Sequence, residues 1–277
     1  MSTFSDRLSR AVAANGSLLC VGLDPVPERL PAGLARDASG VLEFNRRLVE
    51  ATADLVCCFK PNLAFYAALG AGGWDVLAAT IEAVPDPVPV VVDAKCGDIG
   101  PVAGRWAHAI FTELGADAVT VNPYMGSDAV RPFTRHADRG VFLVCLTSNP
   151  GAADFEAAAV EGGDRLWERV ARRALEWNAE HGNCGLVVGA TRAESMAGLR
   201  RLAPELPFLV PGVGAQGGDL AGSVAGGLRS DGAGLLINAS RGVMHASEGA
   251  DFAEAARAEA DRLRREINRV RGVAQSG

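Results

Sequence analysis

Short runs of apolar residues alternate with longer amphipathic stretches along the whole chain. Eight runs rich in Val, Leu and Ala have the length of strands, and their near-continuous hydrophobicity is typical of parallel strands covered by helices. The predicted strands span residues 18–24, 56–62, 88–95, 118–123, 141–148, 185–191, 208–214 and 234–240. The predicted helices span residues 41–55, 74–83, 102–114, 165–180, 194–202 and 252–271, and a short amphipathic helix precedes the first strand.

Eight strand–helix units in about 250 residues predict a (β/α)8 TIM barrel, with a doubly wound open sheet as the alternative arrangement. Nearly every predicted strand ends in a polar residue or a glycine. A closed barrel brings such ends together at one mouth, whereas an open sheet strings them along an edge, so the pattern favours the barrel. Since no linker or low-complexity segment interrupts the alternation, we expect residues 1–277 to form a single α/β domain.

Composition and charge exclude several functions. A net charge of −6 argues against a nucleic-acid-binding or anionic-membrane-binding surface. No apolar stretch reaches the length of a membrane span, and the first twenty residues lack the apolar core of a secretory signal, so we expect a cytoplasmic protein. The six cysteines lack the C-x-x-C spacing of a zinc site and the four histidines lack ligand spacing, so we expect buried thiols and no metal site.

The chain contains only two lysines, Lys60 and Lys95, and both lie at the end of an apolar strand-like run. A lysine kept where arginine is otherwise used suggests a need for a compact ammonium group whose proton can be released. Asp93, Lys95 and Asp98 follow the spacing D-x-K-x-x-D, in which the first two side chains share one side of an extended strand. Together with Lys60 they predict a charge network that holds a lysine protonated and oriented. A purely structural ion-pair cluster is the alternative, although burying charges without function is usually no better than apolar packing.

A glycine-rich segment, residues 211–218, follows the seventh predicted strand. Its glycines let backbone N–H groups approach an anion closely. The segment contains G-x-G-x-x-G, but dinucleotide binding is disfavoured because the next strand does not end in an acid for the ribose. Loops after strands seven and eight are the usual phosphate-binding place in barrels, and Arg241 offers a bidentate fork there. A phosphate monoester fits this segment better, and a tight turn with a surface arginine is the alternative.

Two further strand ends carry candidate binding residues. Asp24 ends the first predicted strand, where it either accepts sugar hydroxyls or caps a turn before Pro25. Ser148 ends the fifth, where it either bonds a planar polar ring or takes part in ordinary turn chemistry.

Together these segments resemble the orotidine 5′-phosphate decarboxylase family in its longer bacterial form, the type 2 subfamily. The resemblance covers roughly residues 18–271. The motifs that carry it are Gly22-Leu23-Asp24-Pro25, Phe59-Lys60-Pro61-Asn62, Asp93-x-Lys95-x-x-Asp98-Ile99-Gly100, Thr147-Ser148-Asn149-Pro150-Gly151, Gly189-Ala190-Thr191, residues 211–218 and Ser240-Arg241-Gly242. It implies a homodimeric (β/α)8 barrel that converts orotidine 5′-phosphate to UMP and CO2 in pyrimidine biosynthesis, without a cofactor or metal.

The resemblance also implies a role for each candidate residue. Lys60, Asp93 and Lys95 would form a charged array that Asp98 of the partner subunit completes. Lys95 would protonate C6 of the pyrimidine as CO2 leaves. Asp24 and Lys60 would hold ribose hydroxyls, Ser148 would read the pyrimidine edge, and Gln216 and Arg241 would bind the phosphate. The substrate-binding residues implied in this way are Asp24, Asn62, Ser148, Pro211, Gln216, Ser240 and Arg241.

Two positions depart from the family pattern, and three other functions remain open. Val102 stands where threonine is common, and Cys96 follows the motif lysine where arginine is frequent. Magnesium-dependent phosphosugar enzymes of the same barrel group, such as keto-gulonate phosphate decarboxylase or hexulose phosphate synthase, share the D-x-K-x-x-D element, and a metal requirement would distinguish them. A Schiff-base aldolase would be revealed by borohydride trapping. The intact charged array argues against a non-catalytic nucleotide-binding barrel.

Overall fold

Eight parallel strands form one sheet in the order β2-β1-β8-β7-β6-β5-β4-β3. The computed structural model describes residues 2–190, 193–212 and 219–272. Bridges from Phe59 to Val90 and from Asn62 to Asp93 join the outermost strands, β2 and β3, so the sheet closes and the predicted (β/α)8 barrel is confirmed. The strands are β1 Leu19–Leu23, β2 Cys58–Pro61, β3 Val91–Cys96, β4 Ala118–Val121, β5 Gly140–Leu146, β6 Cys184–Val188, β7 Phe208–Val210 and β8 Leu235–Ala239.

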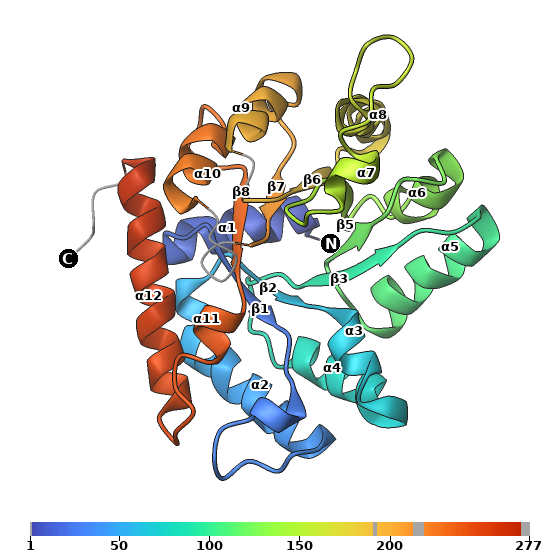
Figure 1. Cartoon of the computed structure of the whole chain (residues 1–277). Helices are drawn as coiled ribbons and strands as arrows, with labels where there is room; N and C mark the ends of the chain where they lie inside the picture. Colours follow the sequence, from blue (N-terminus) through green and yellow to red (C-terminus); the bar gives the residue numbers. More distant parts are fainter. Residues whose placement is uncertain (1, 191–192, 213–218, 273–277) are drawn as a thin grey trace.

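Helices surround the strands (Figure 1). They are α1 Phe4–Asn15, α2 Ala38–Thr52, α3 Leu63–Ala67, α4 Gly73–Glu82, α5 Gly100–His108, α6 Ser127–Thr134, α7 Ala152–Phe155, α8 Leu166–His181, α9 Ala193–Leu202, α10 Leu220–Gly227, α11 Arg241–Met244 and α12 Phe252–Arg271. Short turns of 3-10 helix add η1 Pro27–Arg29, η2 Ala53–Leu55 and η3 Gly70–Gly72, and a π-helical turn, η4 Ala109–Glu113, extends α5. No helix in the described part of the chain is long and apolar enough to cross a membrane.

The predicted helices are all present, but five helices were not predicted. Four of these, α3, α7, α10 and α11, are short or rich in alanine and glycine, so they show little amphipathic period. The fifth, α6, contains Pro132 in its interior, and proline is a poor indicator of a helix.

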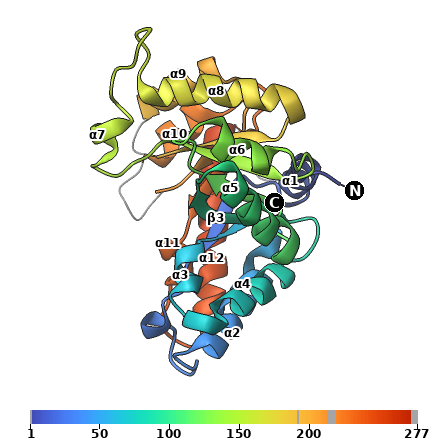
Figure 2. The ribbon, with the colours of Figure 1, turned by 90° about the vertical axis from the view of Figure 1, so that its right-hand side faces the viewer.

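Helix α1 closes one end of the barrel. Its Phe4 ring packs edge-on against Phe142 of β5, with the ring centroids 5.7 Å apart. Phe4 belongs to a buried cluster that also takes one side chain from each of the eight strands, namely Cys20, Cys58, Val91, Ala118, Phe142, Val187, Leu209 and Leu236, and adds Cys57. All six cysteines are free and buried, which confirms the prediction of buried thiols. Figure 2 shows α1 at the opposite end of the barrel from α3, α7 and α11, so the open mouth lies at the carboxyl ends of the strands.

Arg200 of α9 connects the chain segments that lead into β7 and β8. Its guanidinium donates hydrogen bonds to five backbone carbonyls and lies 3.7 Å from the centroid of the Phe208 ring. Only 9% of the residue is exposed. Burial lowers the pKa of Arg200 to about 10, so the group remains protonated at neutral pH. The carbonyls belong to Ala203, Pro204, Leu206, Gly227 and Gly234, which lie in the segments that lead into β7 and β8.

Replacement of Arg200 by lysine therefore tests how much this one guanidinium group stabilises this side of the barrel. An ammonium group has three donors and cannot reproduce the planar arrangement of guanidinium donors. We therefore expect Arg200→Lys to lower the free energy of unfolding by about 2–4 kcal/mol. The neighbouring Arg201 is exposed. Arg201→Lys is the matched control and should change stability by less than about 0.5 kcal/mol. Urea denaturation measures the free energy of unfolding of both variants. Equal values for the two variants would contradict the stabilising role of Arg200.

Candidate active site

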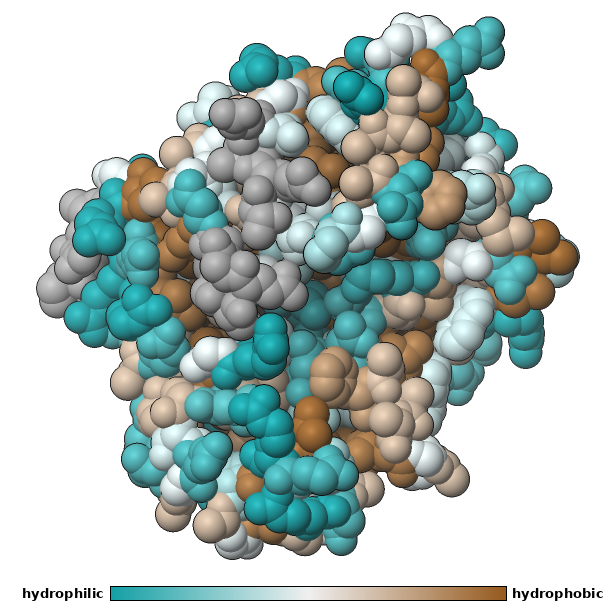
Figure 3. Space-filling model, viewed as in Figure 1, coloured by the Kyte–Doolittle hydropathy of each residue, from teal (hydrophilic) through white to brown (hydrophobic). Residues whose placement is uncertain are grey.

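The open mouth of the barrel carries a group of polar side chains. Figure 3 looks onto this face and shows hydrophilic side chains gathered near its centre. The carboxyl ends of β1, β2 and β3 contribute Asp24, Lys60 and Asp93, and the start of α11 contributes Ser240 and Arg241. The convergence expected from the strand ends is therefore present.

The carboxylate of Asp93 lies at the centre of this group and accepts from four donors. Lys60 Nζ lies 3.1 Å and Asn62 Nδ2 3.2 Å from Oδ2. Lys95 Nζ lies 2.6 Å and Thr120 Oγ1 2.8 Å from Oδ1. An ionised carboxylate offers about four lone-pair sites, so Asp93 is fully satisfied. We call Lys60, Asp93 and Lys95 the charged array.

Burial and charge act against each other in the charged array. Burial would raise the pKa of Asp93, which is only 8% exposed, but the two ammonium groups and their hydrogen bonds outweigh it and hold that pKa well below the usual range. Burial would likewise lower the pKa of Lys60, 3% exposed, but the carboxylates of Asp93 and Asp24 raise it above its usual value. Asp93 and Lys60 are therefore both charged at neutral pH. The Lys95 side chain is 45% exposed and can reach a ligand in the mouth.

A bulge in β3 produces this arrangement. Val92 pairs with Val119 of β4 and Cys96 pairs with Val121, so β3 has two residues more than β4 in this interval. The interval contains Asp93 and Lys95. Lys95 has φ +47°, and it is the only residue other than glycine with positive φ in the described chain. The sequence predicts that Asp93 and Lys95 share one side of a regular strand. The two side chains do meet, but through the bulge rather than through regular alternation.

Asn62 connects the first three strands. Its backbone N–H donates to Asp24 Oδ1 at 3.2 Å, its side-chain amide donates to Asp93, and its Oδ1 accepts from Ala64 N–H at the start of α3. Tyr66 of α3 is fully buried and donates to the carbonyl of Leu23, directly before Asp24. Short helix α3 thus fixes the ends of β1 and β2 beside Asp93.

A pocket of about 270 Å³ opens beside the charged array. This volume is close to the lower end of the range for small-molecule sites, roughly 300 Å³ upward. Seven of the residues singled out in the sequence line it, namely Asp24, Lys60, Asn62, Asp93, Pro211, Ser240 and Arg241. Ser240 lies against the backbone of β1, since a Cβ on Gly22 would stand 1.8 Å from its hydroxyl oxygen.

Three predicted site residues in the described part of the chain do not line this pocket. Lys95 lies beside it through its contact with Asp93. Asp98 is half-buried at the start of α5, where it accepts from Ile99 N–H, and it forms no ion pair within the described residues. Ser148 follows β5 and lies close to Gly189, where a Cβ would stand 2.6 Å from the Ser148 backbone nitrogen. Gln216 lies outside the described residues.

Several lining residues were not singled out in the sequence. Asn238 lines the pocket, whereas Thr120 contacts Asp93 without lining it. Both are buried polar residues within apolar strands, and a polar residue in an apolar run is the signal by which both are detectable. Asn238 donates to Ser240 Oγ at 3.3 Å. Arg29 and His245 come from segments after β1 and β8, and burial lowers the pKa of His245. The remaining new lining residues are Val26 and Phe65, and Gly212 of the predicted glycine-rich segment also lines the pocket.

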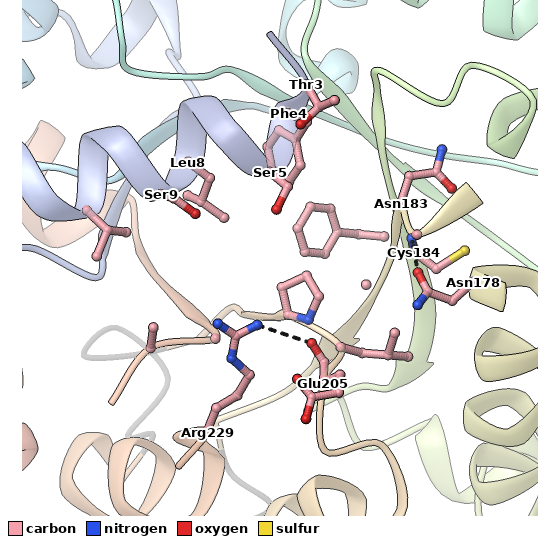
Figure 4. Close-up of a pocket in the computed structure, with 18 of the residues that line it drawn as sticks. Thr3, Phe4, Ser5, Leu8, Ser9, Asn178, Asn183, Cys184, Glu205 and Arg229 are labelled. Atoms are coloured by element: carbon pink, nitrogen blue, oxygen red, sulfur yellow. Dashed lines mark hydrogen bonds between the residues drawn. The ribbon is translucent and has the colours of Figure 1, made fainter. Parts of the chain in front are cut away.

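A larger cavity, about 510 Å³, lies at the other end of the barrel between α1 and the beginnings of β5 to β8 (Figure 4). Some of its polar groups are engaged with one another and with the backbone: Arg229 donates to the carbonyl of Glu205 and pairs with Asp231, and Asn178 accepts from Cys184 N–H. Because both lysines lie at the mouth, the mouth is the candidate active site. Among the described residues, no group of three or more His, Cys, Asp or Glu side chains is arranged to hold a metal ion.

Comparison with known proteins agrees with this geometry. Residues 17–258 match the model of the family described as "Orotidine 5′-phosphate decarboxylase / HUMPS family". The chain is 50% identical to a Thermomicrobium roseum protein named orotidine 5′-phosphate decarboxylase, over 97% of this chain and 96% of that protein. It is 51% identical to a protein of the same name from Aromatoleum aromaticum, over 97% and 99% of the two chains. The solved structure of Leishmania donovani OMP decarboxylase superposes with a TM-score of 0.86 at 44% identity, over 98% of this chain and all of that one. The chain therefore belongs to the orotidine 5′-phosphate decarboxylase / HUMPS family.

Proposed function

We propose that this protein converts orotidine 5′-phosphate to UMP and CO2 without a metal or cofactor, as a step of pyrimidine biosynthesis. The observation that carries the proposal is the buried carboxylate of Asp93 between two ammonium groups, one of which is partly exposed beside the pocket. Relatives named orotidine 5′-phosphate decarboxylase, about half identical over nearly the full chain, support the same substrate.

We propose one orientation of the substrate in the pocket. Arg241 and the glycine-rich segment bind the phosphate, and Gln216 of that segment, which lies outside the described residues, is a further proposed phosphate contact. Pro211 and Ser240 shape the same part of the pocket. Asp24, Lys60 and Asn62 bind ribose hydroxyls, because a carboxylate, an ammonium and an amide offer both donors and acceptors there. Ser148 bonds the edge of the pyrimidine.

The charged array then performs the chemistry. Loss of CO2 leaves a carbanion at C6, which is a poor intermediate in water. Lys95 places a fixed positive charge at C6 before the negative charge develops, and it delivers its proton to C6 as the bond to CO2 breaks. Asp93 lies against the departing carboxylate and holds Lys95 in position. The phosphate is distant from C6. Its contacts with the protein lower the reaction barrier to the extent that they are stronger in the transition state than in the bound substrate.

One feature of the site favours this reaction over that of magnesium-dependent members of the same barrel group. Asp93 accepts from Lys60, Asn62, Lys95 and Thr120, and therefore has no lone pair left for a metal ion. A magnesium site would require carboxylate oxygens free to coordinate the ion.

The direct test follows the absorbance change as orotidine 5′-phosphate becomes UMP. We expect turnover by the purified protein to be the same within about twofold in excess EDTA and in millimolar Mg²⁺, because no proposed step uses a metal. Turnover that appears only with Mg²⁺ would contradict the proposal, and so would no turnover in either buffer.

We also propose that the protein is a homodimer in which Asp98 completes the site of the partner subunit. Asp98 stands beside exposed apolar residues at the start of α5 and in the loop after β4, namely Ile99, Val102, Tyr124 and Met125. Figure 3 shows hydrophobic side chains at the edge of this face where α5 lies. Exposed apolar surface of this kind suits a subunit interface. Val102, which departs from the family pattern, would then contribute apolar contact instead of a hydroxyl.

Mixing two inactive variants tests the shared site. In a hybrid of Lys95→Ala and Asp98→Asn subunits, one of the two sites combines an intact Lys95 with an intact Asp98. Random exchange of subunits makes half of the dimers hybrid, so we expect recovery of about one quarter of wild-type activity. Each variant alone, treated in the same way, is the control and should stay inactive. Failure of the mixture to exceed the two controls, with subunit exchange verified by mass, would contradict a site shared between subunits.

We also propose that the chain forms a single domain and that the protein is cytoplasmic. A single domain over residues 1–277 is supported by the eight strands that share one sheet and by the continuous core around them. A cytoplasmic location is supported by six cysteines that are all unpaired, since reduced thiols are typical of that compartment.

A further inference from the structure

Thr120 lies on β4 directly opposite the bulge in β3. The strand is apolar apart from this residue, and Thr120 is fully buried. Its side chain faces the two residues of β3 that belong to the charged array, although it is 25 and 27 positions from them in the chain. No step of the proposed reaction uses Thr120.

The hydroxyl of Thr120 replaces a bond of the strand ladder. Regular pairing of β3 with β4 stops after Val92 and resumes at Cys96, whose carbonyl accepts from Asn122 N–H at 2.7 Å. Within the gap, the backbone N–H of Lys95 donates to Thr120 Oγ1 at 2.9 Å. The same oxygen lies 2.8 Å from Asp93 Oδ1. One side chain thus contacts the backbone of Lys95 and the carboxylate of Asp93.

The direction of these two bonds is fixed by chemistry. A backbone N–H can only donate, and an ionised carboxylate can only accept. The hydroxyl therefore accepts from Lys95 and donates its single proton to Asp93. It also stabilises a left-handed backbone at Lys95, φ +47°, which costs about 1 kcal/mol or more for a residue with a side chain.

We propose that Thr120 is a positioning residue of the decarboxylase, whose hydroxyl fixes the bulge so that Asp93 Oδ1 meets Lys95 while Oδ2 meets Lys60. This inference rests on the proposed function. Because Thr120 touches the array rather than the pocket, its loss changes the geometry of the reacting groups and leaves the phosphate and ribose contacts in place. The effect therefore falls on kcat more than on KM.

Three substitutions separate the hydroxyl from the packing of the side chain. Thr120→Val keeps the shape and removes the hydroxyl, Thr120→Ser keeps the hydroxyl and removes the methyl group, and Thr120→Ala removes both. We expect the valine and alanine variants to lose about 10- to 100-fold in kcat with KM changed by less than about threefold, and the serine variant to stay within about threefold of wild type. Thr52, another fully buried threonine whose hydroxyl bonds the Leu48 carbonyl within α2, provides the control. Thr52→Val should leave kcat within about twofold of wild type.

Hydrogen exchange gives a readout that does not depend on turnover. The amide of Lys95 should exchange faster in the valine and alanine variants, which lack its acceptor, and at the wild-type rate in the serine variant. If the wild type does not turn over orotidine 5′-phosphate, the proposed function fails, and this exchange pattern still tests the Thr120 contact separately.

Two results would overturn the inference. One is a valine variant with wild-type kcat. The other is equal loss in the serine and alanine variants, which would assign the effect to the methyl group and to packing. Should the valine variant fail to fold, serine and alanine, which differ only by the hydroxyl, decide the question alone.

Discussion

The buried carboxylate of Asp93 is the interaction on which the mouth of this barrel depends. Four donors from three strands and one connecting residue converge on its two oxygens: Lys60, Asn62, Lys95 and Thr120. Asp93 and Lys60 are buried, and buried charges are tolerated only when each is paired and hydrogen-bonded, since the loss of one partner leaves an uncompensated buried charge. The same pairing holds Lys95 at the edge of the pocket, with its side chain 45% exposed.

The fold itself supplies the contacts that hold the charged array. The bridge between Asn62 and Asp93 that closes the barrel also brings Lys60 next to that carboxylate. The bulge in β3 turns Lys95 toward the same carboxylate. Helix α1 and the buried cluster around Phe4 cover the opposite end. The same contacts thus close the barrel and position the charged array, and preorganised charge is what stabilisation of a developing carbanion requires.

The sequence predicted the barrel, and it singled out the charged residues that the structure brings together at the mouth, for different reasons. The strands could be predicted because parallel strands covered by helices are apolar on both faces. Lys60 and Lys95 could be singled out because the chain otherwise uses arginine.

The bulge was not predictable, because D-x-K spacing is equally compatible with a regular strand. Thr120 and Asn238 were missed because one polar residue in an apolar run does not show which long-range partner it meets. Nothing in the sequence shows whether Asp98 would contribute to the site of its own subunit or to that of a partner subunit. Short helix α3, which holds the ends of β1 and β2, lacks the length to show a period.

The most direct test of this account is the activity of Asp93→Asn. An asparagine keeps the shape but removes the charge that holds both ammonium groups, so kcat for orotidine 5′-phosphate should fall by at least about 10³-fold. Binding of the product UMP should change by less than about tenfold, because the proposed phosphate contact Arg241 and the proposed ribose contact Asp24 line the same pocket without depending on a bond to Asp93. A folded Asp93→Asn variant with kcat within tenfold of wild type would contradict the claim that this carboxylate organises the active site.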